Sequence, residues 1–156
     1  MLKKTTRILY KIVEALSVFF VFGMVGTVCY VVFTRYVMNN APRWGEEVAL
    51  LCMVWFSLLS ASMAIWDNRH IRVAVWEMVL PKKVFKALEV LVHVILFGIV
   101  VLMCWYGLDL LAVVSRGKMS GTGISYFWLY VSIPVSTAFM LIATMQRIGE
   151  ILADKS

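Results

Sequence analysis

The stretch EVALLCMVWFSLLSASMAIW, residues 47–66, carries no charged side chain after its first residue, Glu47. A helix needs about 20 mainly apolar residues to cross the hydrocarbon core of a bilayer. Three further apolar runs of at least that length occupy residues 12–34, 88–114 and 126–147. Lipid cannot satisfy exposed backbone groups, and none of the runs alternates as a barrel strand does. Each run is therefore predicted to form a transmembrane helix.

The composition also favours a membrane protein. Of the 156 residues, 62% are hydrophobic and 15% are charged, whereas about a quarter of the residues in a soluble domain are charged. The fold class that we predict is an all-α integral membrane protein, with residues 1–156 forming a single four-helix membrane domain. The formal net charge of +6 is carried by residues that flank the apolar runs, which favours contact with anionic lipid headgroups over nucleic acid.

The distribution of basic residues predicts the orientation of the chain. Eleven of the fifteen Lys and Arg residues lie in the N-terminal tail, in the connection between the second and third spans, or at the C-terminal end. The other four lie in the two remaining connections. Because cytoplasmic loops are enriched in Lys and Arg, we predict that both termini are cytoplasmic.

The connection between the second and third spans, DNRHIRVAVWEMVLPKK at residues 67–83, has basic ends and an apolar middle. Its middle is too short to span a bilayer, so we predict a short interfacial helix on the cytoplasmic face. The alternative is a tight connection without a helix. The residues expected to anchor this segment at the cytoplasmic interface are Arg69, His70, Arg72, Trp76, Lys82 and Lys83.

Small residues at helical spacing predict close helix packing, within the chain or against a larger partner subunit. They are Gly23 and Gly26 in the first span, and the pairs Ser57 with Ala61 and Ser60 with Ala64 in the second. In the fourth span Pro134 cannot donate a hydrogen bond to the carbonyl of Tyr130, so a kink is predicted there.

Few ionisable residues lie within the spans, and each is a candidate functional site. Glu14 is in the first turn of the first span, where a structural carboxylate and a proton-coupling site are both possible readings. Asp109 is predicted to pair with Arg35, Arg43 or Arg116. Glu46 and Glu47 open the second span, where the helix dipole favours acidic side chains.

The chain contains no catalytic or metal-binding constellation, so we predict neither an enzyme nor a cofactor. The three cysteines, each inside an apolar run, are interpreted as packing residues.

Several motifs occur together in a fixed order within residues 35–83. They are Arg35, Trp44-Gly45-Glu46-Glu47, Trp55, His70-Ile71-Arg72-Val73 and Pro81. This ordered set resembles the small permease subunit of tripartite ATP-independent periplasmic (TRAP) transporters, the DctQ-like family. Two positions depart from the pattern: Gly45 stands where Ser or Thr is common, and Ala74 where an Asp often follows.

The resemblance implies a small non-catalytic subunit in the bacterial inner membrane. It would anchor and enlarge the static scaffold of a large permease subunit, which carries an organic acid together with sodium. Sialic acid and C4-dicarboxylates are among the expected substrates. A periplasmic substrate-binding protein and membrane lipids complete the implied partners.

The outer basic residues are the candidates for docking the binding protein. They are Arg35, Arg43, Arg116 and Lys118. The alternative is that they bind lipid phosphates or the chain's own acids Asp109, Glu46 and Glu47. Residues 116–125 are rich in Gly and Ser, and a mobile loop is predicted there.

Two other functions are compatible with four spans. One is a self-sufficient proton-coupled exporter that uses Glu14. The other is a structural subunit of a different membrane complex, such as an oxidoreductase.

Overall fold

The computed structural model describes residues 2–40, 42–67 and 82–153, and most of this part of the chain is helical. The helices are α1 (Leu2–Val37), α2 (Arg43–Trp66), α4 (Lys82–Val114), α5 (Phe127–Tyr130) and α6 (Ser132–Ala153). Four segments are long and apolar enough to cross a membrane, namely Arg7–Val37, Arg43–Trp66, Val90–Val114 and Phe127–Gln146. The prediction of an all-helical chain with four such helices is confirmed. The predicted interfacial segment lies largely outside the described residues, including Arg69, His70, Arg72 and Trp76.

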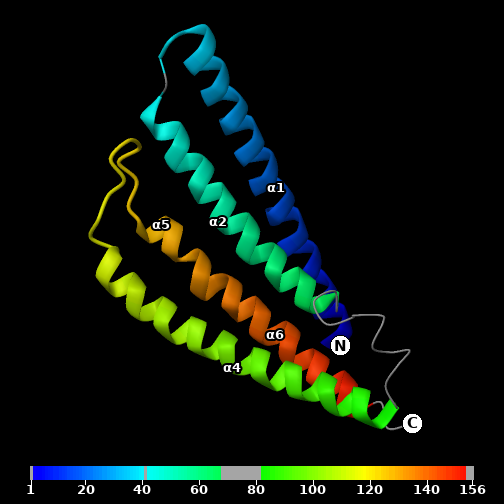
Figure 1. The fold of residues 1–156 in the computed structure, drawn as a ribbon. Coiled ribbons are helices and arrows are strands. Elements are labelled where there is room, and N and C mark those ends of the chain that lie inside the picture. The colour runs from blue at the N-terminus through cyan, green and yellow to red at the C-terminus, as the bar shows by residue number, and fades with distance from the viewer. Residues whose placement is uncertain (1, 41, 68–81, 154–156) are drawn as a thin grey trace.

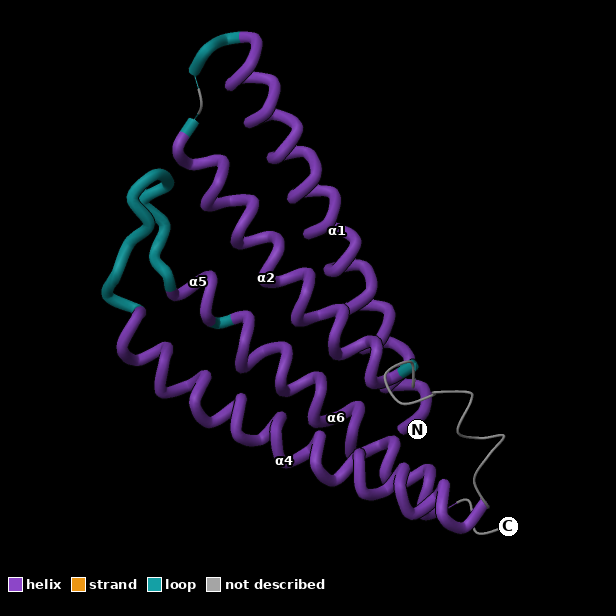
Figure 2. The backbone as a smooth tube through the Cα atoms, viewed as in Figure 1, coloured by secondary structure: helices purple, strands orange, loops and turns teal. Residues whose placement is uncertain are grey.

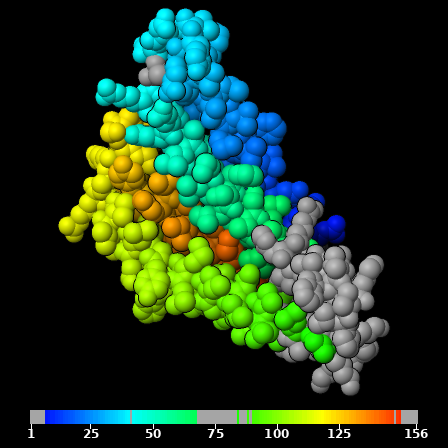
Figure 3. Space-filling view, in the orientation of Figure 1, coloured from blue at the N-terminus to red at the C-terminus, as the bar shows by residue number. Residues whose placement is uncertain are grey.

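The long helices lie side by side in one layer, in the order α1, α2, α6 and α4 (Figures 1 and 2). Helix α1 packs on α2, α2 packs on α6, and α6 packs on α4. Within the described residues no contact joins α1 to α4, as a closed bundle would require. Figure 3 shows the helices as adjacent bands across the surface.

The two outermost helices, α1 and α4, expose large apolar side chains along much of their length. Phe22 in α1 is 72% exposed, and Val113 in α4 is 77% exposed. Contiguous apolar surface of this kind is suited to lipid or to another protein and not to water. The single layer therefore leaves surface on both outermost helices for such contacts.

Two glycines allow neighbouring helices to approach closely. A Cβ atom at Gly45 would collide with the side chain of Val31, so α1 and α2 meet where Gly45 has no side chain. A Cβ atom at Gly107 in α4 would lie 2.9 Å from Cγ2 of Ile133 in α6. Because lipid supplies little hydrophobic drive for helix association, such close contacts are a main source of packing energy in membranes.

One cluster of buried core residues lies between α2, α4 and α6. It consists of Ile65, Val100, Met140 and Ala143. Buried hydroxyls on α6 adjoin this core, and several donate back to carbonyls of their own segment, such as Thr144 Oγ1 to the carbonyl oxygen of Met140 at 2.8 Å. This internal pairing lets polar side chains lie buried at a helix contact.

The fourth apolar segment is interrupted at Val131, between α5 and α6. Pro134 is the third residue of α6, where its missing N–H removes a bond to Tyr130. The interruption is therefore close to the position at which the sequence predicts a kink.

Trp55 connects three segments of the layer. Its indole N–H donates to the carbonyl oxygen of Trp128 in α5 at 2.9 Å, and its ring stacks on Phe20 of α1 at 5.3 Å between centroids. One side chain of α2 thus binds helices on both of its sides.

We predict that Trp55→Phe destabilises the fold, because an aromatic ring remains beside Phe20 while the carbonyl of Trp128 loses its donor. The expected loss is about 0.6–2 kcal/mol, the range for interhelical hydrogen bonds in membranes. Reversible unfolding in mixed detergent micelles measures it. Trp44→Phe is the matched control, since Trp44 stacks on Tyr30 and its indole N–H donates no hydrogen bond within the described residues. Equal stability of the two variants would contradict the assigned role of the Trp55 N–H.

Candidate functional site

The connection between α1 and α2 and the segment 115–126 lie at the same end of the layer, which we call the hairpin end (Figure 1). The beginning of α1 and the end of α6 lie at the opposite end (Figure 1). The four basic residues predicted to dock a partner all belong to segments at the hairpin end. They are Arg35, Arg43, Arg116 and Lys118.

Residues 115–126 form a folded hairpin, where the sequence predicts a mobile Gly/Ser-rich loop. Met119 N–H donates to the carbonyl of Ile124 at 2.8 Å, and Tyr126 N–H donates to that of Gly117 at 3.1 Å. The side chain of Met119 is buried. Gly123 has a φ of +71°, a backbone conformation that glycine adopts without strain. The glycines therefore serve the hairpin geometry.

Glu47 of α2 binds the tip of this hairpin through both carboxylate oxygens. Oε1 accepts the N–H of Gly121 at 2.7 Å and the hydroxyl of Ser120 at 3.3 Å. Oε2 accepts the N–H of Thr122 at 2.7 Å and its hydroxyl at 2.8 Å. Hydrogen bonds to a charged acceptor are stronger than those between neutral groups. Glu47 is thus a four-bond clamp between α2 and the hairpin.

The hairpin tip touches the backbone at the start of α2. A Cβ atom at Gly121 would lie 2.8 Å from the carbonyl carbon and oxygen of Arg43 and 2.9 Å from the nitrogen of Trp44. Only glycine leaves room for this approach. Figure 3 shows the hairpin, in yellow, beside the start of α2, in cyan. A hollow of about 310 Å³ opens next to it, lined by Pro42, Arg43, Glu46, Glu47 and Ser120.

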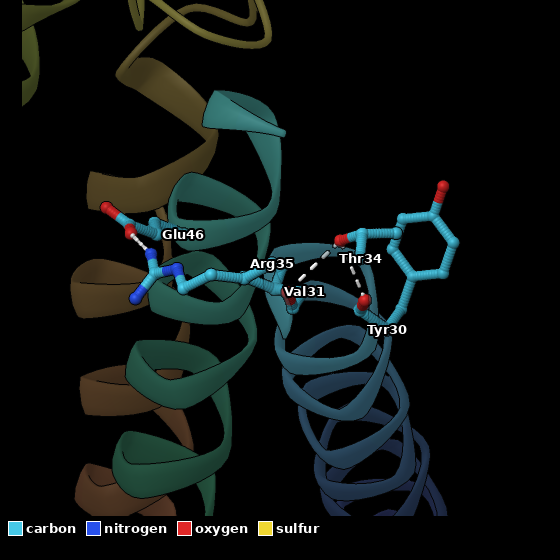
Figure 4. A network of polar contacts seen from close by, with 5 residues as sticks. All are labelled: Tyr30, Val31, Thr34, Arg35 and Glu46. Atoms are coloured by element: carbon cyan, nitrogen blue, oxygen red, sulfur yellow. Dashed lines mark hydrogen bonds and ion pairs between the residues drawn. The ribbon is translucent and has the colours of Figure 1, made fainter. Parts of the chain in front are cut away.

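Arg35 pairs with Glu46 across the α1–α2 contact, at 2.8 Å between Nη2 and Oε1 (Figure 4). Both side chains are more than half exposed, so the pair contributes little stability, about 0–1 kcal/mol by analogy with surface ion pairs. Thr34, beside Arg35, donates to carbonyls of its own helix, those of Tyr30 and Val31 (Figure 4). The charge of Arg35 is therefore compensated within the chain.

The other three basic residues of the hairpin end are exposed. Within the described part of the chain, no carboxylate lies within ion-pair distance of Arg43, Arg116 or Lys118. The prediction that Asp109 pairs with a neighbouring arginine is wrong, because it forms no ion pair with Arg35, Arg43 or Arg116. Asp109 instead lies exposed on α4.

Glu46 and Glu47 lie near the start of α2, as the sequence predicts, but the N-cap residue Pro42 makes no side-chain cap. Their carboxylates bind Arg35 and the hairpin. The sequence offers no local signal for the second contact, because Glu47 and its partners are 73 to 75 residues apart.

The small residues predicted for helix packing have different surroundings. A Cβ at Gly23 would meet Sγ of Cys52 in α2 at 3.5 Å, whereas one at Gly26 would meet nothing within 4 Å. Ala61 packs against the buried core, and Ser57 is exposed. Ser60 and Ala64 are both half-buried. The closest approaches between helices involve Gly45 and Gly107, which the sequence analysis did not select for packing.

Glu14 lies exposed at a shallow groove of about 330 Å³ between α1 and α2, together with Ser17, Phe22, Phe56 and Ser60. The groove walls are mainly apolar. In the described residues, no group of three His, Cys, Asp or Glu side chains is placed to hold a metal ion.

The apolar layer and its polar hairpin end define the chain as a multi-pass membrane protein. Residues 24–154 match the family described as tripartite ATP-independent periplasmic transporters, DctQ component. The chain belongs to this family, which is a membrane component of transporters and not a family of enzymes. Family and helices together place it in the bacterial inner membrane.

Two curated relatives that are similar to this chain in sequence are named as TRAP transporter permease proteins. The sialic acid TRAP transporter small permease protein SiaQ of Vibrio cholerae is 25% identical over 97% of this chain and 87% of its own length. The sialic acid TRAP transporter permease protein SiaT of Haemophilus influenzae is 24% identical over 74% of this chain, which corresponds to 19% of that larger protein.

We predict that Gly121→Ala moves the hairpin away from α2, because the added Cβ collides with rigid backbone atoms of Arg43. Amide hydrogen exchange of residues 117–125 should become several-fold faster. Gly26→Ala makes the same chemical change where there is open space, so it serves as the control. Unchanged exchange in Gly121→Ala would contradict the close contact.

Proposed function

We propose that this chain is the non-catalytic small subunit of a sodium-coupled TRAP transporter for organic acids. In this proposal it packs on the static scaffold of the large permease subunit and anchors that scaffold in the bilayer. The single layer of apolar helices is the observation that carries the proposal, since a carrier that moves needs a wide, fixed frame beside it. The exposed faces of α1 and α4 offer surface for the large subunit and for lipid.

The proposed orientation places the hairpin end in the periplasm and both termini in the cytoplasm. The distribution of Lys and Arg supports it. In this orientation the hairpin end faces the periplasmic substrate-binding protein, and we propose that it helps to dock the loaded form.

Three exposed cations, Arg43, Arg116 and Lys118, are the proposed docking groups. Their charges have no carboxylate partner among the described residues, so they are available to acidic side chains of a binding protein. Arg35 contributes less in this proposal than the sequence alone indicates, because Glu46 compensates it. Such charges chiefly accelerate encounter and fix its orientation.

The transported molecule is proposed to be an organic acid recognised by the large subunit and the binding protein. The names of the two sialic acid relatives favour sialic acid over C4-dicarboxylates. The family assignment favours a transporter subunit over the self-sufficient exporter, so this proposal gives Glu14 no transport role.

We predict that the triple variant R43Q/R116Q/K118Q weakens docking while leaving the complex intact. Association of the binding protein with the purified membrane complex should slow about tenfold or more at low ionic strength, and the difference should shrink at physiological salt. Stopped-flow binding at the two salt concentrations measures this.

The double variant R35Q/E46Q is the matched control, because it removes a basic residue of the same end without changing the net charge. It should bind as the unmodified complex does. Equal association rates for the triple variant and this control would remove the docking proposal, while co-purification with the large subunit tests assembly separately.

A further inference from the structure

We propose that Glu47 is a positioning residue for docking: it holds the hairpin on α2 so that Arg116 and Lys118 keep a fixed geometry with Arg43. The inference rests on the proposed function, because it assumes that these cations meet an acidic partner. The claim that Glu47 holds the hairpin on α2 depends only on the contacts of Glu47. The partner in question is the carboxylate-bearing face of a soluble protein.

The hydrogen bonds of Glu47 fix the orientation of the hairpin relative to α2 as well as the position of its tip. Two successive backbone N–H groups, of Gly121 and Thr122, point at different oxygens of one planar carboxylate, both at 2.7 Å. The hydroxyl of Thr122 adds a third bond at 2.8 Å. A hairpin that rotated about its stem would lose several of these bonds together.

Hydrogen bonds within the hairpin connect its fixed tip to the backbone around Arg116 and Lys118. Lys118 pairs in an antiparallel bridge with Ser125, and the hydroxyl of Ser125 donates to the carbonyl of Ser115 at 2.9 Å. Lys118 lies in the bridged stem, and Arg116 lies in the turn before it, between Ser115 and Gly117, whose carbonyls accept hydrogen bonds from Ser125 and Tyr126. A tip fixed on α2 therefore also restricts the stem.

An independent contact relates the hairpin to the third cation. Gly121 approaches the backbone of Arg43 so closely that a Cβ would lie 2.8 Å from its carbonyl group. The docking cations thus belong to two segments that meet at this point and are held together by Glu47. Preorganised binding groups lose less conformational entropy on association than groups that must be ordered by the partner.

Glu46 provides a matched control within the same chain. It is the neighbouring carboxylate at the same helix end, but it binds Arg35 and not the hairpin. Glu46→Gln and Glu47→Gln change the net charge equally. Loss of a negative charge should, if anything, favour an acidic partner, so weaker docking in E47Q alone cannot arise from net charge.

The first experiment measures the hairpin geometry in the complete membrane complex. The native cysteines are replaced, and spin labels are attached to Asn40→Cys and Ile124→Cys, both at exposed positions of the hairpin end. Pulsed electron–electron double resonance then gives the distribution of distances between the two labels. We expect a narrow distribution in the parent complex and in E46Q, and a broad or shifted one in E47Q.

The second experiment measures uptake by proteoliposomes as the concentration of loaded binding protein is varied. For E47Q we expect the concentration for half-maximal uptake to rise several-fold, with an unchanged rate at saturation. A merely destabilised complex would instead lose rate at saturation. E46Q, which removes the partner of Arg35, should keep the parent rate at saturation and should not raise the half-maximal concentration.

The outcomes separate this inference from the proposal on which it rests. An unchanged distance distribution in E47Q overturns the clamp, whatever the charge-neutralised variants do. A broadened distribution with an unchanged half-maximal concentration overturns the positioning role. If R43Q/R116Q/K118Q loses docking while E47Q gives one of these two contradicting results, the proposed docking surface still stands. Only the role assigned to Glu47 is then removed.

Discussion

The single layer depends on the packing of α2, because in the described structure α1 contacts no other helix. Lipid provides little hydrophobic drive between helices, so α2 must hold its neighbours by close approach and by hydrogen bonds. Gly45 allows the approach of Val31 on one side, and Trp55 binds a carbonyl of α5 on the other. Through Glu47, α2 also holds the hairpin that joins α4 to α5. One helix thus organises the packing and the polar end.

These contacts give a physical meaning to the motif Trp44-Gly45-Glu46-Glu47 and the aromatic residue eight positions later. Each member meets a different partner: Trp44 stacks on Tyr30, Gly45 meets Val31, Glu46 pairs with Arg35, Glu47 clamps the hairpin, and Trp55 binds Trp128. At Gly45 the absence of a side chain is what permits the helix contact with Val31. The motif is therefore better understood as a set of contacts around the start of α2 than as a helix cap.

The helices could be predicted from the sequence because length and polarity alone decide whether a segment suits a bilayer. The interruption before α6 was also predictable, since the missing N–H of Pro134 is a local property. The folded hairpin was not, because Gly and Ser are common both in flexible linkers and in tight turns. Its fixation by Glu47 depends on a residue more than seventy positions away, and one sequence contains no signal for such a contact. For the same reason, Asp109 was assigned an arginine partner that the fold does not bring near it.

In the proposed function the chain is a fixed frame without a solute path of its own, and its contribution depends on a larger subunit that moves beside it. The most direct test is transport by proteoliposomes that contain this chain alone, the large permease subunit alone, or both, with loaded binding protein and a sodium gradient supplied outside. The account predicts no uptake by this chain alone and gradient-driven uptake of the organic acid when the two subunits are present together. Gradient-driven uptake by this chain alone would contradict it.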